Sequence, residues 1–346
     1  MLLVFIMAGV LWGIGVATKA PVRLRLGMIF ALWAGVVLAH AVLPAGNTLR
    51  VATGGDLRVW LSVGVVAAVV LAYRAALGAL RKRVAPVVVP PMRAGAFRPA
   101  ELDRYARHIM LREIGGPGQR ALREARVLVV GAGGLGSPAL MYLAGAGVGV
   151  IGVIDPDMVE GSNLQRQIIH SDQRIGMPKV FSAEAAMRSL NPFIEVRPYH
   201  RRLDEASASA LIADYDLVLD GTDNFEAREL VNRTCAELGK PLIWGAITQW
   251  EGQISLFDPA RGGPCYACVF PNRPAPGLVP TCADAGVVAP LPGVIGAMMA
   301  LEAVKHITGA GAGLMGRLMI HDALYAETRM IAVARRGDCA VCGALH

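Results

Sequence analysis

The chain has 346 residues, of which 54% are hydrophobic and 18% charged, and this composition excludes a largely disordered or fibrous protein. The formal charge of +7 is unevenly distributed, because residues 1–100 contain 11 Lys and Arg with a single acid and the remainder carries −3. A body with this charge and with 6% aromatic residues offers neither the basic surface nor the stacking platform that nucleic-acid binding requires, so we expect no nucleic-acid partner.

Three apolar stretches predict a membrane anchor over residues 1–83. Met1 to Thr18 and Leu26 to Gly46 contain no charged residue, and Val59 to Leu80 contains only Arg74. A spanning helix needs about 20 apolar residues, so we predict three transmembrane helices. A cleaved signal peptide is the alternative for the first stretch, although the basic n-region is missing.

Basic residues around these stretches predict the orientation of the chain. The first connection contains Lys19, Arg23 and Arg25, and the third stretch ends in Arg81-Lys82-Arg83. The positive-inside bias then predicts a multi-pass protein of the inner (cytoplasmic) membrane with its C-terminal body in the cytoplasm. Residues 84–100 contain Val-Val-Val-Pro-Pro and predict an extended linker to a body of residues 101–346.

The body begins with the pattern of a nucleotide-binding unit. The β-branched run Arg126 to Val130 predicts a strand, and a helical pattern follows from Ser137 to Ala146. Between them, Gly131, Gly133 and Gly136 fit G-x-G-x-x-G, in which backbone N–H groups and a helix N-terminus approach phosphate oxygens. The sequence therefore predicts an α/β fold, a Rossmann-like sheet with helices on both faces, that binds a nucleotide.

Two further strands are expected to bring carboxylates to the same edge of this sheet. Val150 to Ile154 ends at Asp155 and Asp157, where an acid can bind ribose hydroxyls. Leu217 to Leu219 ends at Asp220, and Asp223 and Asn224 follow. Asp220 is either a turn cap or a ligand, and Asp223 is the stronger candidate.

A nicotinamide oxidoreductase and an ATP-using enzyme both fit up to this point. After the second strand come the consecutive residues Ser162, Asn163, Leu164, Gln165, Arg166 and Gln167, and then Pro178-Lys179. Splitting a triphosphate needs cations that neutralise developing negative charge, so Arg166 and Lys179 favour ATP chemistry. The alternative is that both cations belong to a solvated surface.

Two Cys-x-x-Cys pairs predict a metal site. Four thiolates without an open position are typical of structural zinc, against the alternative of coincidental free thiols; the pairs are Cys265 with Cys268 and Cys339 with Cys342. Cys235 is most simply a buried small hydrophobe. Cys282 lies in a loop-like stretch before the apolar helix Val294 to Thr308, and we interpret it as either a structural thiol or a nucleophile.

These motifs together resemble the MoeB/ThiF/HesA adenylyltransferases, bacterial relatives of the ubiquitin-activating enzymes. The resemblance extends from about Tyr105 to Cys342 and includes Arg104-Tyr105-Ala106-Arg107, the glycine loop, Thr222-Asp223-Asn224, Glu251-Gly252-Gln253 and both cysteine pairs. Members of this family transfer AMP from ATP to the C-terminal Gly-Gly carboxylate of a small ubiquitin-like sulfur carrier, which then accepts sulfur.

The resemblance also implies roles for individual residues. It puts Gly134 and its loop against ATP and Asp155 at the ribose. It puts phosphates at Asn163, Arg166 and Lys179, and Mg²⁺ at Asp223. Arg107 resembles the arginine that the family supplies across a homodimer interface.

The segment Ser162 to Ser182 is more similar to the molybdopterin branch, so we predict a carrier of the molybdopterin-synthase small-subunit type. A thiamine-pathway or other carrier is the alternative, and a non-catalytic membrane-tethered nucleotide-binding module is the alternative from another class. The chain stops four residues after Cys342, so we expect sulfur to come from a separate persulfide donor.

Overall fold

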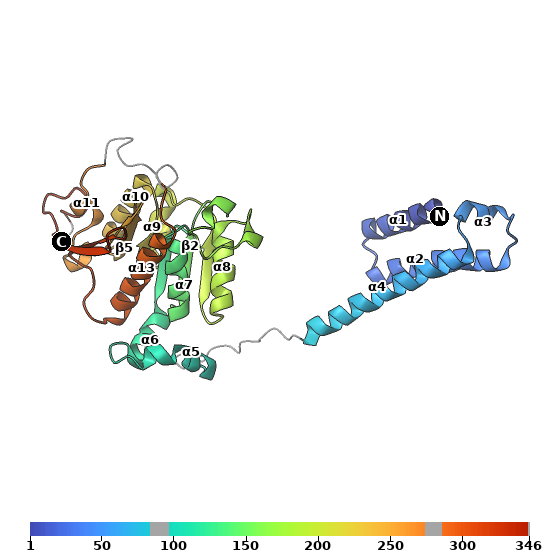
Figure 1. The fold of residues 1–346 in the computed structure, drawn as a ribbon, viewed down its shortest axis with the longest axis horizontal. Coiled ribbons are helices and arrows are strands. Elements are labelled where there is room, and N and C mark those ends of the chain that lie inside the picture. The colour runs from blue at the N-terminus through green and yellow to red at the C-terminus, as the bar shows by residue number, and fades with distance from the viewer. Residues whose placement is uncertain (84–96, 274–285, 345–346) are drawn as a thin grey trace. The chain divides into compact units, whose positions relative to one another are not determined.

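The computed structural model describes residues 1–83, 97–273 and 286–344, which belong to two compact units, Met1–Ala94 and Gly95–His346 (Figure 1). Residues 84–96 of the predicted linker lie outside the described residues. Pro99 and Ala100, its last two residues, form the start of α5 (Pro99–Ile109).

The N-terminal unit is helical, and two of its helices are long and apolar enough to cross a membrane. Its elements are α1 (Leu2–Ala17), α2 (Val22–Val42), α3 (Thr48–Thr53) and α4 (Leu57–Arg83). The two candidates are α2 and α4. With 16 residues, α1 is about 24 Å long and falls short of the roughly 30 Å hydrocarbon core. The prediction of three spans is therefore corrected to two candidates among the described residues.

Close packing of α2 against α4 depends on a missing side chain. A Cβ atom added to Gly64 would lie 2.3 Å from the Trp33 ring, so only glycine permits this approach. The Trp33 indole donates a hydrogen bond to the Trp60 carbonyl at 2.9 Å. Outward-facing apolar side chains such as Phe30 and Val65 are 64% and 63% exposed, and such a surface suits lipid better than water.

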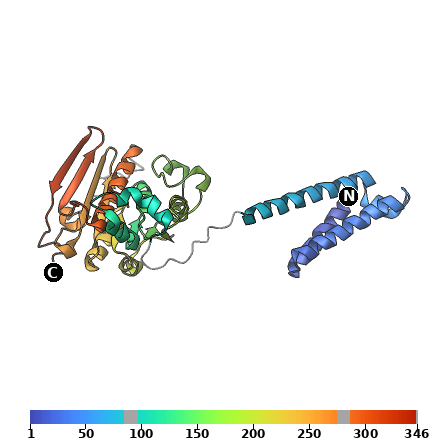
Figure 2. The same cartoon turned by 90° about the horizontal axis from the view of Figure 1, so that it is seen from below.

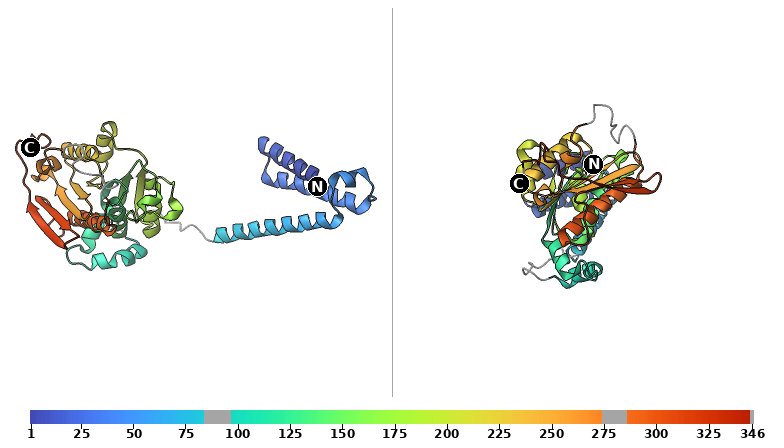
Figure 3. Two further views of the ribbon diagram at one scale, coloured as in Figure 1. Left: turned by 45° about the horizontal axis from the view of Figure 1, so that its top comes forward. Right: turned by 90° about the vertical axis from the view of Figure 1, so that its left-hand side faces the viewer.

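The C-terminal unit contains one eight-stranded sheet in the order β3-β2-β1-β4-β5-β6-β7-β8. The strands β1 to β5 run parallel and β6 to β8 antiparallel. Their bounds are β1 (Arg126–Val130), β2 (Val150–Ile154), β3 (Glu195–Tyr199), β4 (Leu217–Asp220), β5 (Leu242–Ile247), β6 (Glu251–Phe257), β7 (Arg317–Asp322) and β8 (Glu327–Ala332). The predicted α/β fold is confirmed at this level, and Figure 3 shows β7 and β8 in red at one side of the sheet.

Helices cover both faces of this sheet (Figure 2). One face packs on α7 (Gly136–Ala146), α8 (Lys179–Leu190) and α13 (Pro290–Thr308), and the other on α9 (Glu205–Ala213) and α10 (Phe225–Glu237). In β1, Val127 and Val129 belong to the first core and Leu128 and Val130 to the second, because successive side chains of a strand point to opposite faces. The other helices among the described residues of this unit are α6 (Gly115–Glu124), η1 (Gly161–Asn163), η2 (Asp172–Arg174), η3 (Pro259–Arg261) and α11 (Tyr266–Val269).

The strand order reverses at β1, which lies between β2 and β4. The loops that follow β1 and β4 lean apart to opposite faces, and open α/β sheets bind their ligands in the crevice that results. The backbone closes the floor of this crevice: Gly131 N–H donates to Ile154 O at 2.9 Å, and Gly221 N–H donates to Val130 O at 3.0 Å.

Candidate active site

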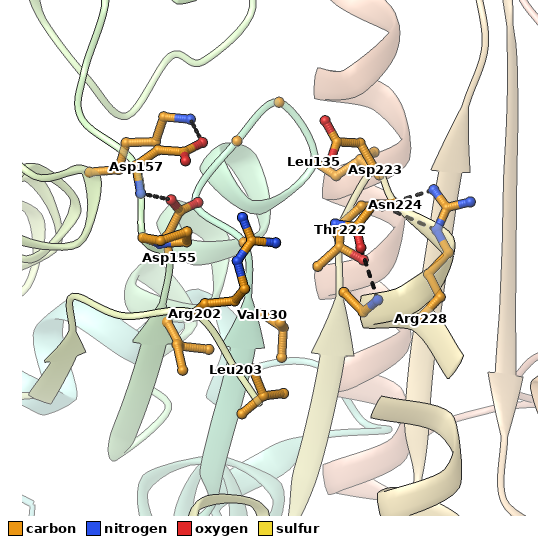
Figure 4. A pocket seen from close by; sticks show the side chains of 18 of the residues that line it. Val130, Leu135, Asp155, Asp157, Arg202, Leu203, Thr222, Asp223, Asn224 and Arg228 are labelled. Carbon is orange, nitrogen blue, oxygen red and sulfur yellow. Dashed lines mark hydrogen bonds and ion pairs between the residues drawn. The ribbon is translucent and has the colours of Figure 1, made fainter. Parts of the chain in front are cut away.

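A cavity of about 720 Å³ lies at this crevice, between the loops that follow β1, β2 and β4 (Figure 4). Six cationic and four acidic side chains line it, a balance that suits an anion accompanied by a metal cation. The cations are Arg166, Lys179, Arg201, Arg202, Arg228 and Arg273, and the acids are Asp155, Asp157, Asp223 and Glu226.

The glycines of the first loop have two distinct purposes. A Cβ atom on Gly136 would lie 1.9 Å from Gly131 O, so Gly136 is required by the packing of the loop itself. A Cβ atom on Gly133 would meet only the Gln167 amide at 3.8 Å, so the fold leaves space beside it. The N–H groups of Gly133, Gly134 and Leu135 have no partner among the described residues. Together they form a cradle suited to phosphate oxygens.

Asp155 anchors this loop from the end of β2. Its carboxylate accepts hydrogen bonds from Ala132 N–H and Asp157 N–H, both at 2.8 Å. Burial raises the pKa of Asp155, and the nearby Lys179 ammonium opposes that shift. Both carboxylate oxygens of Asp155 hold backbone N–H groups in place, and the residue itself lines the cavity.

Lys179 is the first residue of α8 and lines the cavity beside Asp155. Its ammonium lies 2.8 Å from Asp157 Oδ2, with 8% of the lysine side chain exposed against 62% of the aspartate side chain. The ion pair holds the lysine in a buried position at the cavity wall, where its ammonium can also approach the negative charge of a ligand. Arg166 also lines the cavity, and its guanidinium donates to Ser162 O at 3.3 Å.

Several predicted site residues do not line the cavity. Four of them lie in or just after η1, in the turn that leads to Arg166; they are Ser162, Asn163, Leu164 and Gln165. Arg107 lies on α5, and Tyr105 of the same helix is next to Gly147 at the C-terminal end of α7. This end of α7 is opposite to the glycine loop. Cys282 lies outside the described residues.

The glycine loop, Asp155 and Lys179 form the first wall of the cavity, which is called the β2 and α8 wall. The second wall, called the α10 wall, comes from the loop after β4 and from α10. Asp220 is fully buried and accepts a hydrogen bond from Thr222 N–H at 2.9 Å, so it shapes the turn, and burial raises its pKa. Asn224 caps α10 by accepting from Ala227 N–H at 2.9 Å. Asp223 is exposed at the cavity surface, as Figure 4 shows.

Sequence reasoning missed the arginines of this wall. Arg228 donates to Thr222 O at 2.8 Å, and its guanidinium carbon lies 5.6 Å from the centre of the Trp244 ring. Arg202 extends between the two walls in Figure 4. The spacing of Arg228, four residues after the capping Asn224, was a usable signal, because residues four apart share one side of a helix.

The four paired cysteines come together in one buried cluster. Their Sγ atoms all lie within 4.8 Å of one another, and individual separations are 3.8 Å, 3.6 Å and 3.4 Å. A tetrahedral site with Zn–S bonds of about 2.3 Å requires sulfurs roughly 3.8 Å apart, so the cluster is compatible with zinc. Tyr266, between two of these cysteines, donates its N–H to Asn232 Oδ1 at 2.8 Å and so joins the cluster to α10.

Comparison with known proteins assigns this body to a family. The model of the ThiF family matches residues 105–341. The chain belongs to the ThiF family. The sulfur carrier protein adenylyltransferase of Thermus thermophilus is 47% identical over 247 residues, which are 70% of this chain and 91% of the relative. The SAMP-activating enzyme E1 of Haloferax volcanii is 47% identical over 243 residues, 70% of this chain and 89% of the relative.

The solved structure of E. coli MccB with ATP has the same fold as this ThiF-family body. The two superimpose with a TM-score of 0.60 at 23% identity, over 69% of this chain and 74% of MccB. The ThiF match begins at Tyr105 and ends just before Cys342, so it includes both walls of the cavity and three of the four clustered cysteines. It does not include the N-terminal unit.

Proposed function

We propose that this ThiF-family chain transfers AMP from ATP to the C-terminal carboxylate of a ubiquitin-like sulfur carrier. The supporting observation is one cavity that combines a buried lysine and several arginines with glycine-loop N–H groups that have no partner in the part of the chain that the structure describes. The names of the Thermus and Haloferax relatives agree with this activity. ATP use is the common feature expected of the family.

The chemistry joins two anions, and the cavity offers the charge that this requires. A carboxylate oxygen of the carrier attacks the α-phosphorus of ATP, the bond to the bridging oxygen breaks, and pyrophosphate leaves with the electron pair. Lys179 and Arg166 would neutralise the charge that develops on the phosphates, and the Gly133 to Leu135 N–H groups would bind phosphate oxygens. Asp155 would hold the ribose. No general base is needed, because a carboxylate is already ionised at neutral pH.

Two bound metals complete the proposal. Asp223 offers an exposed carboxylate at the cavity surface, which fits Mg²⁺, and that ion would neutralise phosphate charge. Asn224 would lie beside it. The four-thiolate cluster of Cys265, Cys268, Cys339 and Cys342 would hold a structural zinc, because four cysteines leave no open position for a substrate.

Arg107 requires a second copy of the chain, because it lies away from the cavity of its own chain. We propose a homodimer in which each Arg107 reaches the partner's ATP. Mixing inactive Arg107→Ala with inactive Lys179→Ala tests this, since a mixed dimer would contain one complete site and recover up to about a quarter of the wild-type activity. Recovery of no activity from the mixture would exclude donation between chains.

The remaining assignments concern the setting of the reaction. We propose that α2 and α4 anchor the enzyme in the inner membrane with residues 101–346 in the cytoplasm. The carrier would be of the molybdopterin-synthase type and would receive sulfur from a separate persulfide donor. Cys282 remains a structural thiol or a nucleophile of that later step.

The decisive experiment is ATP–pyrophosphate exchange with the purified full-length chain. Each candidate carrier, of the molybdopterin, thiamine or another pathway, is added in turn with its Gly-Gly terminus intact or amidated. We expect exchange only with an intact carrier, and fastest with the molybdopterin type. If none of the carriers supports exchange although ATP binds tightly, the result would favour a non-catalytic nucleotide-binding module.

A further inference from the structure

A buried histidine lies behind the glycine loop without lining the cavity. His170 is 7% exposed, and both ring nitrogens have partners. Nε2 lies 3.0 Å from Ala132 O, and Nδ1 lies 2.9 Å from Ser182 Oγ. The histidine thus connects the first turn of α8 to the glycine loop.

These two partners determine where the proton of the ring resides. A carbonyl oxygen only accepts, so Nε2 must carry the hydrogen and donate it to Ala132 O. In a neutral ring Nδ1 is then an acceptor, and the Ser182 hydroxyl donates to it. Burial lowers the pKa of His170 below its ordinary value, the hydrogen bond to Ala132 O opposes that shift, and the positive charges of Lys179 and Arg174 add to it. The neutral ring therefore predominates at pH 7.

The contact acts on a peptide group that faces the cavity. The Ala132 carbonyl and the Gly133 N–H belong to one planar trans peptide, in which C=O and N–H point in opposite directions. Holding the carbonyl against His170 therefore directs the Gly133 N–H away from the histidine. Gly133 lines the cavity, and its N–H has no partner among the described residues.

The same contact belongs to a closed ring of interactions around the nucleotide site. Ala132 N–H donates to Asp155, which also accepts from Asp157 N–H. Asp157 pairs with Lys179, and α8, which begins at Lys179, returns through Ser182 to the histidine. Each of these contacts therefore helps to hold the loop in one orientation.

We propose that His170 is a positioning residue for ATP, because its fixed Nε2–H holds the Ala132 peptide so that the Gly133 N–H faces a phosphate oxygen. The inference rests on the proposed function only in taking ATP as the ligand. It assigns to His170 no contact with ATP and no proton transfer.

Equilibrium binding of ATP to the purified full-length chain tests this without any carrier. His170→Leu removes the donor, and we expect its Kd for ATP to rise about 10-fold, the loss typical of an unsatisfied buried carbonyl. His170→Gln retains a side-chain N–H, and we expect it to bind ATP within about 3-fold of wild type. In the exchange assay the KM for the carrier stays unchanged in both variants, whereas the KM for ATP follows the Kd.

His200 is the matched control, since its Nε2 lies 3.0 Å from Pro156 O beside the same site but in an exposed position. His200→Leu should leave the Kd for ATP within about 2-fold of wild type, as is usual for an exposed hydrogen bond. Wild-type ATP affinity in His170→Leu, or an equal loss in His170→Gln, would overturn the proposal.

A second variant covers the case in which His170→Leu does not fold. Ser182→Ala leaves Nδ1 without a donor and removes one of the two contacts that hold the ring in place, so the Kd for ATP should rise by about 3-fold. An unchanged Kd in Ser182→Ala would contradict the proposal. If the wild-type chain binds ATP but none of the carriers supports pyrophosphate exchange, the proposed function would be refuted and the role of His170 in ATP binding would not.

Discussion

The two walls of the cavity differ in how firmly their polar groups are held. On the β2 and α8 wall, Asp155, His170 and Lys179 are 6%, 7% and 6% exposed and hydrogen-bonded in a closed ring. On the α10 wall, Asp223 is exposed and Arg228 half-buried. The first wall is therefore organised before any ligand binds, whereas the second can adjust to what enters.

This difference matches the two substrates that we propose. A nucleotide is always the same molecule, so a preorganised wall reduces the conformational cost of binding it. A protein tail arrives in many conformations and suits a wall whose exposed side chains can adjust to it. The α10 wall is instead supported from behind, through Asn232 and Tyr266, by the cysteine cluster.

The largest expected effect comes from removing one charge from each wall. Lys179→Ala and Asp223→Ala should each lower carrier-dependent pyrophosphate exchange by about 10²-fold or more, the loss typical of a transition-state electrostatic partner. Raising the Mg²⁺ concentration should restore part of the activity in Asp223→Ala and none in Lys179→Ala, because only the first variant weakens the binding of the metal.

Glu226→Ala provides the control for this pair, since Glu226 is an acid that lines the same wall as Asp223. We expect its exchange rate to stay within about 3-fold of wild type, as surface substitutions usually allow. Near-normal exchange in Lys179→Ala or Asp223→Ala would refute the assigned roles.

The preorganised wall was also the more predictable one from sequence. The glycine spacing, Asp155 after a β-branched run and Lys179 after a proline are local signals, and β1 and β2 have the bounds that the pattern indicated. His170 was missed because its role depends on Ala132, 38 residues earlier in the chain. No periodicity or spacing in a single sequence encodes that contact.

Tertiary packing explains the other differences between prediction and structure. Strand β3 contains Pro198 and alternates with charged residues, so its pattern is weak, and Arg201 and Arg202 beyond it could not be assigned to the sheet edge. In the N-terminal unit, apolar composition alone could not show that α1 ends at Ala17, too soon to cross a bilayer.

The next effect concerns the support of the α10 wall. Cys339→Ser should remove the proposed zinc, and we expect the melting temperature to fall by about 10 °C, because metal affinity contributes directly to folding stability. Below that temperature, exchange should remain within about 3-fold of wild type, since a four-thiolate site has no catalytic position. Elemental analysis should give about one zinc per wild-type chain. A metal-free wild-type protein of unchanged stability would contradict this account.

A smaller effect tests the burial of the first wall through pH. Burial lowers the pKa of His170 and of His306, so the unfolded chain binds their protons at higher pH than the folded chain does. The contribution of these two neutral histidines to the stability of the folded chain is complete above about pH 6.5. It is lost as the pH falls toward their pKa values in the folded chain. We expect the free energy of unfolding to fall by about 1 kcal/mol between pH 7 and 5.5, measured by urea denaturation.

His170→Gln should make this pH dependence shallower without removing it, since His306 still titrates. Asp155 acts with the opposite sign, because burial raises its pKa: it favours the folded state as the pH falls further, so the measurement should stop above about pH 5. An identical slope in wild type and His170→Gln would show that the histidine is not buried as a neutral ring.

The smallest expected effect comes from removing the N-terminal unit altogether. Both walls belong to the unit Gly95–His346, so a chain that begins at Phe97 should be released from the membrane and retain exchange within about 2-fold of the full-length protein.

Contacts at the start of α5 explain why the shortened chain should begin at Phe97. The Phe97 ring lies 6.4 Å from that of Tyr105, and Arg98 N–H donates to Glu101 at 2.9 Å to cap α5. A chain that begins at Met110 is the contrasting variant, since it lacks Arg107 and the Tyr105 hydroxyl that Asn191 contacts at 2.8 Å. If the chain from Phe97 is soluble but loses exchange by tenfold or more, the membrane unit is part of the catalytic assembly, and the preorganised wall alone does not account for ATP chemistry.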